Sequence, residues 1–161
     1  MSQAEESETQ QLSRNLNELL QELRVAQAGV QILFGFLLSI AFTDRYAEAS
    51  GFVKGTHLVT VLFVVVAVVL LIAPVAYHRL LFRLGRREQI IEVSNRFAVA
   101  GLVSLALAMA GTVMLVVEVS IGTGAAIVAA AAAALLFATL WFVLPIRQRN
   151  RGPAAERRSS T

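Results

Sequence analysis

The sequence predicts an all-α protein: a four-transmembrane-helix bundle with cytoplasmic extensions of helices 1–3. Three observations favour it, namely four long uncharged stretches, a high mean hydropathy and an uneven placement of arginine. The uncharged stretches, runs one to four, are Val25–Thr43, Thr56–His78, Phe97–Val117 and Val119–Ile146. Each can cross a bilayer, which takes about 20 apolar residues in a helix. A hydrophobic content of 57% and a mean hydropathy of +0.67 are too high for a soluble domain of this length.

Basic residues alternate between the two sides of the four runs. Two precede run one, two follow it, five lie between runs two and three, none between runs three and four, and five follow run four. Cytoplasmic loops carry the excess of Lys and Arg, so both termini and the middle loop are expected in the cytoplasm. We expect a multi-pass protein of the cell (inner or plasma) membrane. The net charge of +3 is then explained by the membrane topology and by attraction to anionic lipid head groups at the inner face. It does not indicate nucleic-acid binding.

The chain divides into one membrane domain and two polar tails. Residues 1–9 and 150–161 are expected to be disordered, and the polar, acidic start predicts an uncleaved first anchor. The membrane domain covers residues 10–149. Its spans are expected at about 25–43, 57–78, 97–118 and 124–146. A polar loop is expected at 44–55, and tight turns at 85–86 and 120–124.

A heptad pattern runs through the first helix and continues on both sides of the membrane surface. Its positions keep a 4-3 spacing through Leu12, Leu16, Leu19, Leu23, Ala26, Val30, Leu33 and Leu37. Without a helix breaker, this pattern predicts a helix from about residue 9 to 43, about 50 Å long against about 30 Å of hydrocarbon. The excess must project into the cytoplasm. The seam can serve the internal bundle or a homodimer, so a homo-oligomer stays open.

Runs two to four carry further packing signals. Pro74 predicts a kink in the second helix. Small residues form a stripe on run three and fill the start of run four, at Gly101, Ser104, Ala108, Gly111, Ala125, Ala126 and Ala129–Ala134. Small residues let helices approach closely in lipid, so we expect the last two helices to pack tightly against each other.

Polar residues within the apolar runs give the first candidate site. Gln27 and Gln31 continue a polar stripe of helix one that also includes Asn17, Gln21 and Arg24. These amides either line a cavity or ion path or form hydrogen bonds between helices, the more common role. Glu118 continues the small-residue stripe of run three. It is a candidate proton or cation site, or else an interfacial carboxylate near His57, Arg45 or Lys54.

Charged residues on the cytoplasmic extensions give the second candidate site. Its members are Glu18, Glu22, Arg24, Arg79, Arg83, Arg86, Arg87 and Arg96. They can form an ionic lock between helix one and the hairpin of helices two and three, or a docking surface for an acidic partner or anionic lipid. His78, beside Arg79, is a candidate cytoplasmic pH sensor or an ordinary interfacial residue.

Several kinds of chemistry have no support in the sequence. The absence of cysteine excludes disulfides, thiolate metal sites and cysteine nucleophiles. His57 and His78 fall at opposite ends of run two, too far apart for a metal site within one helix. There is no nucleophile elbow, phosphate loop, dinucleotide fingerprint or HExxH. We therefore expect neither an enzyme nor a cofactor or metal site.

Three segments together resemble a known family: NELLQELRVAQAGVQILFGFLL, LLIAPVAYHRLLFR and NRFAVAGLVSLALAMAGTV. Over about residues 14–120, the chain is similar to small four-span bacterial membrane proteins of unknown function, some of them automatically labelled sodium:proton antiporters. The resemblance implies the four-helix fold and no established activity. Ion exchange usually needs ionisable groups near the midplane of the membrane. This chain offers two glutamines and the peripheral Glu118.

The sequence therefore favours a non-enzymatic helix-bundle scaffold or accessory subunit that acts by protein or lipid interaction. The alternative is a small oligomeric ion- or proton-coupled transporter.

Overall fold

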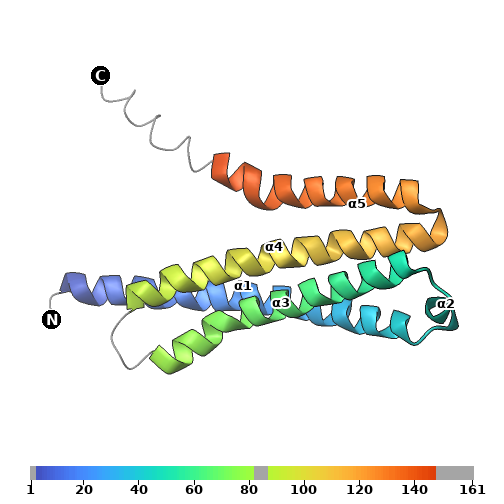
Figure 1. The fold of residues 1–161 in the computed structure, drawn as a ribbon. Coiled ribbons are helices and arrows are strands. Elements are labelled where there is room, and N and C mark those ends of the chain that lie inside the picture. Colours follow the sequence, from blue (N-terminus) through green and yellow to red (C-terminus); the bar gives the residue numbers. More distant parts are fainter. Residues whose placement is uncertain (1–2, 82–86, 148–161) are drawn as a thin grey trace, which may run out of the picture. The chain divides into compact units, whose positions relative to one another are not determined.

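The structure is a computed structural model that describes residues 3–81 and 87–147, and helices account for nearly all of this part (Figure 1). No strand occurs among these residues. The elements are α1 (Gln3–Ala41), α2 (Asp44–Ala47), α3 (Gly51–Leu81), α4 (Arg87–Ser120), α5 (Thr123–Ala138) and the π-helical turn η2 (Thr139–Val143). Four helical segments are long and apolar enough to cross a membrane: Leu23–Ala41, Gly51–Tyr77, Val93–Ser120 and Thr123–Arg147. The expected all-α fold with four candidate spans is confirmed, and it indicates a multi-pass membrane protein.

The N-terminal segment differs from the expectation. We expected residues 1–9 to be disordered, but α1 begins at Gln3. The sequence QAEESETQQ explains the difference, because alanine, glutamate and glutamine favour helices. Acidic residues near a helix N-terminus also complement its dipole. The expected tail at 150–161 and turn at 85–86 lie outside the residues that the structure describes.

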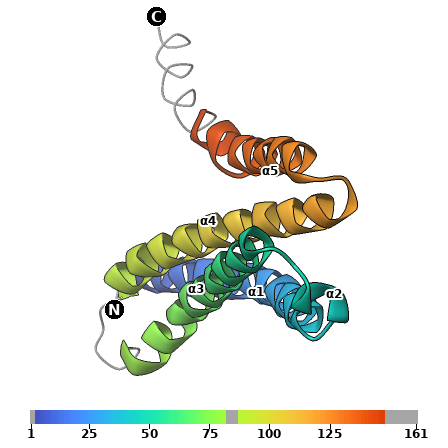
Figure 2. The same cartoon turned by 45° about the vertical axis from the view of Figure 1, so that its right-hand side comes forward.

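The first connection is also more helical than expected. The polar loop predicted at 44–55 contains the short helix α2, and α3 already begins at Gly51. α2 lies at the turn between α1 and α3 (Figure 2). Thr43 caps it, because the Thr43 hydroxyl accepts a hydrogen bond from the Tyr46 N–H at 3.2 Å. The same hydroxyl donates to the Ile40 carbonyl at 2.8 Å. One threonine thus ends α1 and starts α2.

Residues 1–108 form one compact unit, whose core follows heptad spacing on each helix. In α1, the seam residues Leu23, Val30 and Leu37 are buried within the chain. The buried residues of α3 and most of those in the first part of α4 follow the same alternation of three and four: His57, Thr60, Val64, Ala67, Leu71 and Pro74 in α3, and Ser94, Ala98, Gly101, Leu105 and Ala108 in α4. Ser104 and Ala106 are buried beside this seam of α4. This spacing is that of coiled-coil packing. The described part of the α1 seam therefore serves the internal bundle.

Residues 109–161 form the second unit, with the end of α4, a turn and α5. The turn predicted at 120–124 is confirmed: Gly122 has a φ of 124°, which a residue with a side chain rarely adopts. Ala126 is buried, but residues 127–138 are half-buried or exposed. The tight packing that we expected for the last two spans stays a prediction. After α5, the Leu144 N–H donates to the Thr139 carbonyl, a π-type bond that accommodates Pro145.

Candidate functional site

One polar contact joins α1 and α3 inside the spans. Gln27 is half-buried in α1, and its Nε2 donates to the Leu71 carbonyl of α3 at 3.1 Å. Leu71 lies three residues before Pro74. Proline has no N–H and disturbs the helical hydrogen bonds of the preceding turn. The carbonyl that loses its helical donor at Pro74 is that of Leu70, and Gln27 bonds the next carbonyl along α3, as the hydrogen-bonding interpretation of the polar stripe expects.

α4 approaches the same leucine closely. A Cβ at Gly101 would lie 2.8 Å from both Cγ and Cδ2 of Leu71, and 3.3 Å from Cβ of Leu70. Leu71 and Pro74 are fully buried, so Leu71 has little room to move. Only glycine fits at this position without a shift of its neighbours. We call the group Gln27, Leu71, Pro74 and Gly101 the Gln27 junction, because it holds three helices at one level.

A second polar group ties the other end of α1 to α2 and α3. His57 is buried near the start of α3, with its Nε2 2.9 Å from the Leu37 carbonyl of α1. Since a carbonyl only accepts, Nε2 carries the proton. In the neutral ring, Nδ1 then accepts from the Tyr46 hydroxyl at 3.2 Å. The two rings also meet edge to face, with centroids 4.9 Å apart. We call Leu37, Tyr46 and His57 the His57 clamp.

This clamp was not predicted from the sequence. His57 was expected only as a possible neighbour of Glu118, and as a residue too far from His78 to share a metal ion with it. A usable signal existed: His57 and Thr60 precede Val64 and Ala67 at the three-four spacing of a buried seam. A polar residue on such a face needs a partner. Ser94, also buried in its seam, differs in that its hydroxyl has no hydrogen-bond partner in the described structure.

Glu118 forms a local contact in the second unit. Its Oε1 accepts a hydrogen bond from the Thr123 hydroxyl at 2.9 Å, across the turn that joins α4 to α5. The side chain is half-buried, and its Oε2 is buried without a hydrogen-bond partner among the described residues. The residue lies two positions before the end of the span Val93–Ser120. This place at the end of a span agrees with the interfacial interpretation.

The rest of the polar stripe on α1 points away from the bundle. Gln21, Arg24 and Gln31 are exposed, although Gln31 lies only one turn beyond the bonded Gln27. The side chain of Asn17 lies outside the described part. The described side chains of the stripe therefore form no continuous polar lining. Gln27 and Gln31, which the sequence grouped, have different surroundings.

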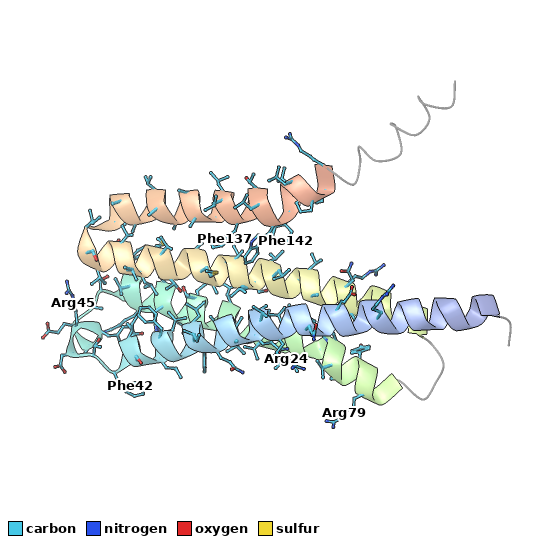
Figure 3. All side chains as sticks on the ribbon, turned by 180° about the vertical axis from the view of Figure 1, so that it is seen from behind. Arg24, Phe42, Arg45, Arg79, Phe137 and Phe142 are labelled. Carbon is cyan, nitrogen blue, oxygen red and sulfur yellow. The ribbon has the colours of Figure 1, made fainter. Side chains whose placement is uncertain are left out.

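The charged candidate site is only partly described. Glu18, Arg24, Arg79 and Arg96 have exposed side chains. Arg24 and Arg79 lie toward the end of the α1–α3 pair opposite to Arg45 and Phe42 (Figure 3). Arg83 and Arg86 lie outside the described residues, as do the side chains of Glu22, His78 and Arg87. The ionic lock, the docking surface and the pH sensor stay predictions.

The described polar groups are suited to holding helices rather than to bond chemistry. The three ties described above, two within the first unit and one within the second, use an amide, an imidazole and a carboxylate. Within residues 3–81 and 87–147, no group of three or more His, Cys, Asp or Glu side chains is placed to hold a metal ion. Two of the ties join α1 to α3, one of them through α2, and the third joins the end of α4 to the start of α5. The arrangement can fix helix positions and registers.

Comparison with known proteins gives a family and no further relative. No curated protein and no solved structure matches the chain significantly. Residues 5–145, which contain all four candidate spans apart from the last two residues of the fourth, match a family of unknown function. The chain therefore belongs to the family of unknown function DUF6328.

Proposed function

We propose that the protein is a non-enzymatic scaffold or accessory subunit of the cell membrane that docks a helix of a partner protein on its first helix. The observation that carries this proposal is the length of α1. It is one helix from Gln3 to Ala41, but its candidate span covers only Leu23–Ala41. Twenty residues therefore extend beyond the span, about 30 Å at 1.5 Å per residue. Such a projecting helix offers a surface to a partner at the membrane face.

The neighbouring helices end earlier than α1. From Gln27, α1 continues for about 36 Å to Gln3, whereas α3 continues for about 15 Å from Leu71 to Leu81. From Gly101, α4 continues for about 21 Å to Arg87. If the three helices are measured from the level of Gln27, the described end of α3 lies beside about residue 17 of α1. The start of α4 lies beside about residue 13 of α1. The heptad positions 12 and 16 thus lie beyond the described part of α3, where a partner helix can pack against them.

The basic residues support a cytoplasmic location for this extension. Arg24 and Arg79 lie at the end of the unit from which α1 projects, and five basic residues precede run three. The positive-inside rule places that end in the cytoplasm, with both termini and the middle loop. Exposed arginines there also attract anionic head groups, by about 1 kcal/mol for each basic residue close to the surface. Lipid binding would orient the extension for docking.

Site-specific crosslinking in intact membranes tests the docking proposal. A photoreactive amino acid is placed at Leu16, and at Arg14 as the matched control, because Arg14 is exposed and lies off the seam. We expect one defined heteromeric adduct from position 16, abolished by Leu12→Asp in a chain that still inserts. Adducts only with lipid, only with a second copy, or equally from both positions would overturn the proposal.

The alternative function is a small oligomeric ion- or proton-coupled transporter. One observation favours it: the buried Oε2 of Glu118 has no hydrogen-bond partner in the described structure. Its place at the end of a span argues against it, since coupling sites usually lie near the midplane. Proton flux, measured in proteoliposomes with a pH dye and a sodium gradient, tests the transporter function. Proton flux that disappears in Glu118→Gln supports transport, and no flux under any gradient eliminates it.

A further inference from the structure

Gln31 occupies an unusual place for an amide side chain. The candidate span of α1 runs from Leu23 to Ala41, so its middle residue is Ile32 and Gln31 is next to it. The side chain is exposed, not packed into the bundle. At this depth, each end of the span is about 13 Å away along the helix. A glutamine side chain is too short to reach water, so its amide faces hydrocarbon unless another protein covers it.

The surface around Gln31 is shaped for close approach by another helix. Ala28, Gly35 and Ser39 share this face at spacings of three and four residues, and all three are exposed. A Cβ placed at Gly35 would meet no atom within 4 Å, so the space beside the backbone is open. Gly35 and Ser39 are also four residues apart, the small-xxx-small spacing at which transmembrane helices pack closely. The face thus combines one polar side chain with small neighbours that let another helix approach closely.

The chain itself offers α1 no obvious partner for this amide. The opposite seam of α1, with Val30 and Leu37, is buried in the bundle, and Gln27 already bonds α3. The last helix carries no polar side chain from Ala125 to Ala138, so it has no side-chain donor or acceptor to offer. A partner with a polar group at the same depth is needed.

We propose that two copies of this chain dimerise through the face of α1 formed by Ala28, Gln31, Gly35 and Ser39, with the two Gln31 amides hydrogen-bonded at the bilayer midplane. Two copies that insert in the same orientation place their α1 helices parallel, so each residue meets its own equivalent at the same depth. An amide both donates and accepts, which makes it complementary to itself. A two-fold interface of this kind is the commonest form of homo-oligomer. The dimer does not depend on the docking function proposed above.

Disulfide crosslinking tests the geometry, because the chain has no cysteine. Ala28→Cys and Gly35→Cys, which keep the Gln31 amide, are oxidised in liposomes at a low protein-to-lipid ratio. Val66→Cys is the matched control, since Val66 is also exposed and lies two residues from the middle of the span Gly51–Tyr77. We expect covalent dimers from positions 28 and 35, and none from 66. Monomers at both 28 and 35, or equal crosslinking at 66, overturn the proposal.

Association measurements test the hydrogen bond separately. Energy transfer between labelled copies in liposomes gives the dimer dissociation constant. We expect Gln31→Leu to raise it by about 5- to 30-fold, whereas Gln31→Asn retains most of the affinity. At a dilution where all copies are monomeric, the thermal unfolding midpoint of the bundle should be the same in both variants, because Gln31 is exposed in the single chain. Association of Gln31→Leu as tight as that of the native chain overturns the role of the amide.

Discussion

The side-chain amide of Gln27 donates a hydrogen bond to the backbone carbonyl of Leu71 at 3.1 Å, three residues before the buried Pro74. A glutamine in a span needs a hydrogen-bond partner, and a backbone carbonyl of α3 accepts from this one. Because the amide and the carbonyl lie at one level, they form a specific contact between α1 and α3. This contact fixes the register of the two helices.

Replacement of Gln27 by leucine should lower the free energy of unfolding by about 1 kcal/mol, because the hydrogen bond is lost. Gln21→Leu is the matched control, since the same change in α1 removes an exposed amide that belongs to no proposed interface. Equilibrium unfolding in mixed micelles, followed by circular dichroism, measures both. Equal costs for Gln27→Leu and for the control variant would show that the bond to the Leu71 carbonyl does not stabilise the bundle.

Gly101→Ala should lower the free energy of unfolding by about 1–3 kcal/mol, the usual cost of overpacking. The new methyl group would lie 2.8 Å from two atoms of Leu71, which is fully buried. Gly29→Ala is the control, because nothing lies within 4 Å of a Cβ there. The double variant Gly101→Ala with Leu71→Ala should cost less than the sum of the two single changes. Additive costs would contradict the close contact.

Hydropathy and heptad spacing were sufficient to predict most of the fold. The charge-free runs predicted four candidate spans, and the unbroken pattern through Leu23, Val30 and Leu37 predicted one long first helix with these residues on one face. The physical reason is that both signals are local. A helix forms where its own residues favour it, and a span is recognised by its own apolar length.

The contacts between helices were harder to predict. In α3, every residue from Val61 to Val75 is apolar, with Pro74 as the one break, so periodicity could not show which face is buried. The partners of Gln27 and His57 are backbone carbonyls, which every residue possesses and no sequence pattern marks. Glu118 was expected near a basic residue or His57. Its described partner, Thr123, lies instead in the turn that the sequence did predict.

Loss of the His57 imidazole should destabilise the α1–α3 pair more than loss of the Tyr46 hydroxyl. His57→Phe removes both hydrogen bonds and leaves the Leu37 carbonyl without this donor, a cost of about 1–3 kcal/mol. Tyr46→Phe removes one bond and should cost about 0.5–1.5 kcal/mol. Unfolding in mixed micelles compares the two. Nitrogen-15 NMR of the histidine should also show the proton of the neutral ring on Nε2, and a proton on Nδ1 alone would contradict the clamp.

Cysteine labelling should show that the connection between α1 and α3 is outside the cell and that the N-terminus is inside. Ser50 is exposed in this connection, and twelve of the fourteen basic residues fall on the other side of the predicted membrane. A membrane-impermeant maleimide should therefore label Ser50→Cys in intact cells, and Ser2→Cys only after permeabilisation. The opposite pattern would invert the topology and place the helical extension of α1 outside, where no cytoplasmic partner could reach it. The docking function would then be excluded together with the topology, whereas the α1 dimer would remain possible, since it depends only on both copies having the same orientation.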